Sequence, residues 1–429
     1  MSFNSPLSPG RASIGLPDVP LLPVVRQTTW HPILVMCAIA AILLPAHPSL
    51  QSALIAYGVP SPFVAMLFAS PVIYAVLSKR VLSDRNLLII LPFIVYIAWL
   101  LIRSIGSPVL GQENNFASLR GVLILMPLAL LCALVGARNP TCSARAIGIL
   151  GLFALFHYCV ILFTGGSLDE GAGFRSLSSD SENENYQATS FYVGIVGVVM
   201  ASLVARGKGN SVFYGMAGLL LTLMLMGTIG ARSTIVALLV SLMVIVSMSG
   251  LSRVVRLAFI FGPLGVLVIT ISFTFGFLNI DTLQNQLTVV DRFAVLAEDG
   301  DSSQRLRLFS SALQMWFESL ESFLFGGGVG AYPRFIGEAE AGWYPHNFVL
   351  ESLAEGGLVA GLILLWIFFE FATKLRRIGS KSSRFEDIFF GGLSVYTLVS
   401  YQFMGGIQTL WIPTFFVAIF LFTQARQTK

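Results

Sequence analysis

The chain has 429 residues, of which 55% are hydrophobic and 11% are charged, and its mean hydropathy is +0.80. A soluble domain usually carries about 25% charged residues, so this composition excludes an ordinary soluble enzyme. The apolar residues fall in long runs, and a helix of roughly 20 apolar residues spans the hydrocarbon core of a bilayer. The sequence therefore predicts an all-α integral membrane protein.

The N-terminal residues 1–29 contain five prolines and several serines, and we expect them to form a disordered cytoplasmic tail. Twelve apolar runs suitable for crossing a bilayer follow. These runs begin near Trp30, Ser61, Asn86, Gly121, Ala146, Thr189, Val212, Ser233, Leu257, Gly356, Ile388 and Thr409. We expect transmembrane helices 1–9 within residues 30–279, helices 10–12 within residues 356–424, and a cytoplasmic tail at residues 425–429.

Basic residues are concentrated in alternate loops between these runs. Lys79, Arg80 and Arg85 share one such loop, and Arg206 and Lys208 share another. Because Lys and Arg are enriched in short cytoplasmic loops, this pattern places both termini in the cytoplasm. Most of the 22 acidic residues then lie on the opposite face. We expect a multi-pass protein of the bacterial inner membrane, with its functional site facing the periplasm.

The largest segment between spans is predicted to be a periplasmic loop of residues 280–355. Long loops in compact proteins are usually functional or disordered, and the pattern here favours order. Between Ser302 and Ser322 the apolar residues recur at helical spacing, which predicts an amphipathic helix on the membrane surface or over a cavity. These apolar residues are Leu306, Phe309, Leu313, Trp316 and Leu320. A second helix is expected to begin near Pro345 and His346 and to continue into the tenth span.

Two residues near the outer boundary are candidates for chemistry. A lone histidine is more often structural than catalytic, but His346 lies where an outer helix meets the membrane. Arg232 is placed between spans seven and eight, where an arginine is costly and commonly marks an anionic ligand. The alternative is that Arg232 reaches the lipid headgroups. Arg292, Arg305, Arg307 and Arg334 add positive charge to this face, and guanidinium groups pair well with a pyrophosphate.

The sequence lacks the usual patterns for a nucleotide or a metal. No G-x-x-x-x-G-K-[ST] loop and no H-E-x-x-H motif is present. Asp299 and Asp301 match a short Asp-x-Asp pattern, but they fall on the outer face, where nucleotide sugars are not available. We interpret this segment as a solvated turn and expect no cofactor and no metal.

Three stretches resemble the O-antigen ligase and Wzy-type polysaccharide polymerase superfamily. Residues 230–233 (GARS) resemble a small-residue–arginine motif at the outer end of a span. Residues 305–313 followed by 324–330 resemble an R-x-x-x-W-x-x-A-L and L-x-G-x-G run, with phenylalanine in place of the tryptophan. Residues 346–357 resemble the H-N-x-x-L-x-x-x-x-E-x-G signature. Their order and spacing, within a twelve-span layout, carry the resemblance.

The resemblance implies a GT-C-like membrane glycosyltransferase that needs no metal. Its donor would be a glycan on undecaprenyl pyrophosphate and its acceptor a sugar hydroxyl. His346 would be the catalytic base that deprotonates the acceptor or would hold the acceptor for attack, and Arg232 and Arg305 would bind the pyrophosphate as charge develops on the leaving group. Further substrate-binding candidates are Asn185, Arg292, Arg307 and Asn347.

The acceptor is left open by this resemblance. A polymerase would join repeat units of O-antigen or exopolysaccharide, whereas a ligase would transfer the glycan to lipid A-core in lipopolysaccharide biosynthesis. We favour the polymerase, because nothing in the sequence marks a site for lipid A-core. Besides the lipid bilayer, a flippase and a chain-length regulator are candidate partners, and no nucleic acid is expected. A third hypothesis is a flippase for lipid-linked sugars, but its ionisable residues would more often lie at mid-membrane.

Overall fold

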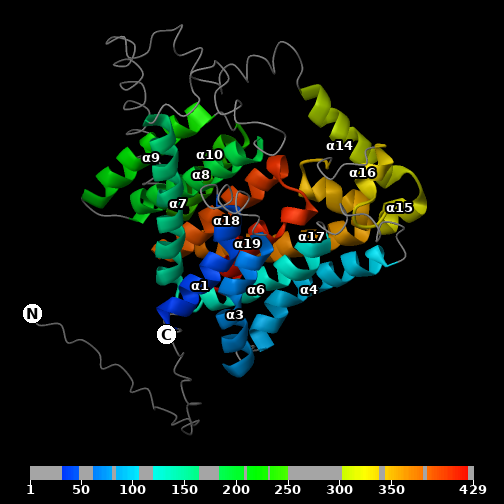
Figure 1. Cartoon of the computed structure of the whole chain (residues 1–429), viewed down its shortest axis with the longest axis horizontal. Helices are drawn as coiled ribbons and strands as arrows, with labels where there is room; N and C mark the ends of the chain where they lie inside the picture. Colours follow the sequence, from blue (N-terminus) through cyan, green and yellow to red (C-terminus); the bar gives the residue numbers. More distant parts are fainter. Residues whose placement is uncertain are drawn as a thin grey trace, which may run out of the picture.

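The computed structural model describes residues 31–47, 61–79, 84–105, 119–163, 183–206, 210–229, 232–249, 302–337, 344–379 and 384–423. All regular elements in these ranges are helices (Figure 1). The longer ones are α1 (Pro32–Leu43), α3 (Ser61–Lys79), α4 (Asp84–Ser104), α6 (Met126–Gly136), α7 (Pro140–Phe163), α8 (Asn183–Arg206), α9 (Asn210–Ile229), α10 (Arg232–Ser249), α14 (Ser302–Phe317), α17 (Phe348–Gly379), α18 (Phe385–Met404) and α19 (Trp411–Phe422). The short ones are η1 (Leu44–Ala46), the π-helix η3 (Gly121–Leu125), α15 (Leu320–Phe325), α16 (Ala331–Phe335) and η6 (Ile407–Thr409).

Four helical segments of the described ranges are long and apolar enough to cross a membrane: Asn86–Ser104, Pro140–Val160, Gln187–Arg206 and Phe348–Ile378. Shorter apolar helices coincide with most of the other predicted runs, and α18 coincides with the run near Ile388. The ninth run, near Leu257, lies outside the described residues. The helices therefore agree with a membrane protein, and the number of twelve crossings stays a prediction.

The burial pattern is that of a protein surrounded by lipid. α18 and α19 lie in the middle of the bundle, and every residue of α19 is buried. The outer helices instead present large apolar side chains to the surroundings, including Tyr74 and Leu77 on α3, Phe156 on α7 and Phe213 on α9. Exposed apolar surface of this extent marks a membrane or partner contact, because water disfavours it.

Small residues allow α8, α10 and α18 to pack closely. Gly392 of α18 lies against Ile245, and its carbonyl accepts a hydrogen bond from Ser241 of α10 (2.8 Å). Further along α18, the Tyr396 hydroxyl donates to the carbonyl of Phe191 on α8 (3.0 Å). Gly391 of α18 lies against Met248 near the end of α10, whereas Tyr396 contacts Ser190, whose hydroxyl bonds to that of Thr234 near the start of α10, so α10 and α18 are antiparallel. The beginning of α10 therefore lies toward the C-terminal end of α18.

Helix α17 is two helical arms joined at Gly357, rather than one straight rod. Gly357 has φ 68° and ψ −168°, which are not helical angles. The rings of Phe348 and Phe368 lie 6.3 Å apart, whereas a straight helix would separate residues at this spacing by about 30 Å. Leu353 and Gly361 also approach each other across the turn. The first arm, residues 348–356, thus folds back beside the second arm, residues 358–379.

Candidate active site

His346 has an unusual backbone conformation at the entrance to the first arm of α17. Its φ of 52° is the single positive value among the non-glycine residues of the described ranges. Such residues carry backbone strain of about 1–3 kcal/mol and are concentrated at functional sites. The imidazole of His346 is half-buried, and its centroid lies 4.2 Å from the centroid of the Tyr344 ring. The structure therefore holds this histidine in a specific, strained position.

Asn347, the next residue, caps the first arm. Its side-chain oxygen accepts hydrogen bonds from the backbone N–H groups of Val349 (3.1 Å) and Leu350 (3.0 Å). Its carbonyl accepts from the N–H of Glu351 (3.0 Å), which begins the helical ladder. Asparagine is among the best N-cap residues because it satisfies otherwise unpaired N–H groups. The His-Asn pair thus combines a strained residue with the cap that starts the helix.

Two buried carboxylates lie one turn apart on this arm, and each holds a separate loop. Glu351, 4% exposed, accepts a hydrogen bond through Oε2 from the N–H of Ile407 in η6 (2.9 Å). Glu355, 1% exposed, accepts through Oε1 from the N–H of Tyr332 in α16 (3.3 Å). A buried carboxylate is costly unless it is hydrogen-bonded, so these contacts organise the arm and both loops.

The glycine-rich segment after α15 docks onto the turn of α17 through its backbone. The N–H of Gly327 donates to the carbonyl of Ala354, and that of Gly328 donates to the carbonyl of Glu355 (both 2.9 Å). A β-carbon on Gly326 would lie 2.3 Å from the carbonyl carbon of Glu355. This docking explains why glycines occur in two sequence motifs that are distant along the chain.

Helix α4 supports the same turn with three polar side chains, which sequence reasoning did not identify as site residues. The Tyr96 and Ser352 hydroxyls are 2.6 Å apart, and Trp99 Nε1 donates to the carbonyl of Gly356 (2.7 Å). Arg103 Nη2 donates to the carbonyl of Gly326 (2.7 Å). Their spacing in the sequence could have revealed them, because residues i, i+3 and i+7 lie on one face of a helix.

Helix α14 carries the two arginines predicted at positions 305 and 307. It packs on the first arm of α17 through Leu308, Ala312 and Met315, which form one buried cluster with Ala354, and Leu350 packs against this cluster. The Arg307 side chain is exposed, and Arg305 lies in the first turn, where only the backbone is described. In Figure 1, α14, α15 and α16 are gathered beside α17 on one side of the bundle.

The apolar row predicted on α14 is not the side of the helix that packs against the protein. The helix itself is present, but Leu306 of the predicted apolar row is 60% exposed, and Leu320 at the start of α15 is 74% exposed. The protein-facing row is instead Leu308, Ala312 and Met315. Both faces are apolar in part, so hydropathy alone identified the helix without identifying the side that packs.

The remaining predicted site positions are described only in part. Arg232 is the first residue of α10, and Asn185 lies in the first turn of α8; the side chains of both are outside the described atoms. Both helix starts lie toward the C-terminal end of α18, where the Tyr344 hydroxyl donates to the carbonyl of Met404 (3.4 Å). The fold therefore brings these backbone positions to the same end of the bundle as His346. Arg292 lies outside the described residues.

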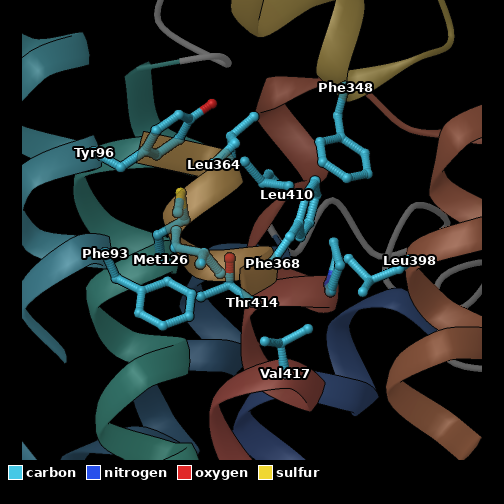
Figure 2. A pocket seen from close by; sticks show the side chains of 12 residues that line it. Phe93, Tyr96, Met126, Phe348, Leu364, Phe368, Leu398, Leu410, Thr414 and Val417 are labelled. Carbon is cyan, nitrogen blue, oxygen red and sulfur yellow. The ribbon is translucent and has the colours of Figure 1, made fainter. Parts of the chain in front are cut away.

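A small apolar cavity of about 20 Å³ lies on the inner side of this region (Figure 2). Phe348 and Phe368 line it from the two arms of α17, Phe93 from α4, and Leu410 and Val417 from the segment leading through α19. Aromatic and aliphatic side chains form nearly all of its wall, so it is a small apolar gap in the helix packing.

Comparison with known proteins locates the site within a family domain. Residues 216–365 match the family model described as O-antigen ligase. This range contains Arg232, Arg305, His346 and the turn at Gly357, and the match confirms the resemblance drawn from the motifs. No curated protein and no solved structure matches the chain.

Proposed function

Because residues 216–365 of this membrane protein form an O-antigen ligase family domain, we propose that the chain transfers glycans from undecaprenyl pyrophosphate at the periplasmic face of the inner membrane. The family domain supports a role in the assembly of O-antigen or a related polysaccharide. We assign the reaction centre to His346 because its backbone is strained at φ 52° and it lies between Tyr344 and the N-cap Asn347.

The proposed reaction is a displacement at the sugar carbon that bears the pyrophosphate. His346 takes the proton of the acceptor hydroxyl, and the hydroxyl oxygen forms a bond to that carbon. The bond between the carbon and the pyrophosphate oxygen breaks, and the lipid pyrophosphate leaves with the electron pair. Arg232 and Arg305 stabilise the negative charge on this leaving group, so no metal ion is required.

The neighbouring residues have supporting roles in this proposal. Arg307, exposed on α14, is available to the glycan or to the pyrophosphate. Asn347 uses its side-chain oxygen as the helix cap, and its amide nitrogen would be the group that donates to substrate. Asn185 and Arg292 stay substrate-binding proposals.

The acceptor decides between two activities of the same site. We propose a second lipid-linked glycan as the acceptor, which makes the protein a polysaccharide polymerase working beside a flippase and a chain-length regulator. Transfer to lipid A-core is the second candidate, and the description of the matching family favours it.

The deciding experiment is reconstitution in nanodiscs with an undecaprenyl-pyrophosphate oligosaccharide, with and without lipid A-core. Wild type is compared with His346→Ala and with His157→Ala, a histidine on α7 outside the proposed site. A ladder of lipid-linked products from wild type and His157→Ala, absent from His346→Ala, supports the polymerase. Glycan on lipid A-core supports the ligase. If wild type forms no new bond with either acceptor, the enzyme proposal is overturned and flipping of the lipid-linked sugar is measured instead.

A further inference from the structure

We infer that Glu351 is a positioning residue for His346, acting through the loop of residues 404–408. This inference rests on the proposed catalytic role of His346. Glu351 falls on an unspecified position of the H-N-x-x-L-x-x-x-x-E-x-G signature, whose acidic letter is Glu355. It lies one turn before Glu355 and points to a different loop.

The first step is the contact between Glu351 and η6. Its Oε2 accepts a hydrogen bond from the N–H of Ile407 (2.9 Å), and the side chain is almost completely buried. In such surroundings a carboxylate requires its partners, and the N–H of Ile407 would equally be left unsatisfied without it. Glu351 therefore fixes the beginning of η6 relative to the first arm of α17.

The second step connects this loop to the histidine. A β-carbon on Gly406 would lie 2.5 Å from Glu351 Oε2 and 2.9 Å from the ring carbon Cδ2 of Tyr344, so Gly406 lies between the two side chains. The Tyr344 hydroxyl donates to the carbonyl of Met404 at the other end of the loop (3.4 Å). The Tyr344 ring lies against the His346 imidazole, with 4.2 Å between centroids. Contacts thus run from Glu351 through Gly406 and Tyr344 to His346.

The third step is the strain at His346. A left-handed φ in a non-glycine residue persists only where the surroundings impose it. On one side, His346 is followed by the cap Asn347. The carbonyl of Asn347 accepts a hydrogen bond from the N–H of Glu351 (3.0 Å), which fixes the cap on the helix. On the other side, it is preceded by the segment from Tyr344, which rests on the loop of residues 404–408. Glu351 takes part in both restraints, through its backbone and through its carboxylate.

The test measures kcat and KM of the full-length wild type and of its Glu351→Leu and Glu351→Gln variants, all in nanodiscs. The amide oxygen of glutamine can still accept from Ile407, so Glu351→Gln should keep kcat within about threefold of wild type. Leucine removes the acceptor, and a displacement of the base by about 1 Å costs roughly 100-fold in rate. We therefore expect kcat of Glu351→Leu to fall roughly 100-fold while KM for the donor changes little. Glu318→Leu, at an exposed glutamate after α14, is the matched control.

A second variant reaches the same loop from the opposite side. In Gly406→Ala the new methyl group must displace either the Glu351 carboxylate or the Tyr344 ring, so we expect the same loss in kcat with little change in KM. Gly148→Ala is its control, because a β-carbon there meets only Val199 Cγ2 at 3.7 Å. Full kcat in both Glu351→Leu and Gly406→Ala would overturn the inference.

Hydrogen–deuterium exchange separates this inference from the proposed function, because it needs no turnover. Glu351→Leu should raise exchange in peptides that cover residues 404–409 and 344–348, whereas Glu351→Gln and Glu318→Leu should not. Unchanged exchange in both peptides would overturn the inference even if the enzyme proposal holds. If no glycan is transferred by wild type, the proposed function fails, while the exchange data still decide whether Glu351 holds the segment that contains His346.

Discussion

Gly326 and Gly357 face each other across the junction of α15 and α17, and neither has room for a side chain. A β-carbon on Gly357 would lie 2.5 Å from the nitrogen of Gly326 and from the carbonyl of Leu324. Both glycines have positive φ, 75° and 68°. This contact joins the glycine-rich segment to the turn of α17, whose first arm begins just after His346.

Alanine at position 357 should therefore destabilise the protein. Alanine at the φ and ψ angles of Gly357 costs about 1–3 kcal/mol, because essentially only glycine adopts them, and the overlap with backbone atoms adds about 1–3 kcal/mol. We expect Gly357→Ala to lower the unfolding temperature in detergent and to abolish transfer. Gly148→Ala, where a β-carbon meets only Val199 Cγ2 at 3.7 Å, should not lower the unfolding temperature, because alanine favours a helix over glycine by about 0.5–1 kcal/mol. Equal unfolding temperatures for the two variants would contradict the observed docking.

Asn347 can be tested for its two proposed roles separately. Asn347→Ala removes the N-cap and should cost about 1 kcal/mol of stability, because two N–H groups lose their acceptor. Asn347→Asp keeps an acceptor and should keep the stability of wild type. If the amide nitrogen also donates to substrate, Asn347→Asp lowers activity without lowering the unfolding temperature. Wild-type activity in Asn347→Asp would leave Asn347 with the capping role alone.

The proposed pyrophosphate contacts predict a graded response at Arg232. Arg232→Ala should lower kcat by at least about 100-fold, because the leaving group loses a positioned cation. Lysine restores the charge but not the bidentate geometry, so Arg232→Lys should recover activity only in part. Membrane insertion, measured by fractionation and size-exclusion chromatography, should be unchanged. Full activity in Arg232→Ala would show that this arginine binds headgroups instead.

The same proposal predicts that chelation has no effect. If Arg232 and Arg305 supply the positive charge, EDTA should leave the rate of transfer in nanodiscs unchanged. Addition of magnesium after EDTA is the control. Inhibition by EDTA that magnesium reverses would require a metal ion in the mechanism and would reduce the role assigned to the arginines.

Several features could be predicted from local sequence. The apolar runs predict helices because a long apolar segment must satisfy its backbone hydrogen bonds internally, and most runs do coincide with helices. The motif at residues 346–357 predicted the helix that follows His346, and the match at residues 216–365 confirmed the resemblance over that range. Asparagine before a helical pattern is itself a local start signal.

The tertiary structure decided what hydropathy could not encode. In a membrane protein the lipid-facing and protein-facing sides are both apolar, so the period of Leu306 and Leu313 did not reveal that Leu308 and Ala312 form the packed side of α14. The reversal at Gly357 depends on a backbone contact with Gly326, which is distant in sequence. Likewise, Glu351 acquires its partner Ile407 only when α17 and η6 are brought together. Local patterns determine which segments become helices, whereas long-range packing determines which side chains surround His346.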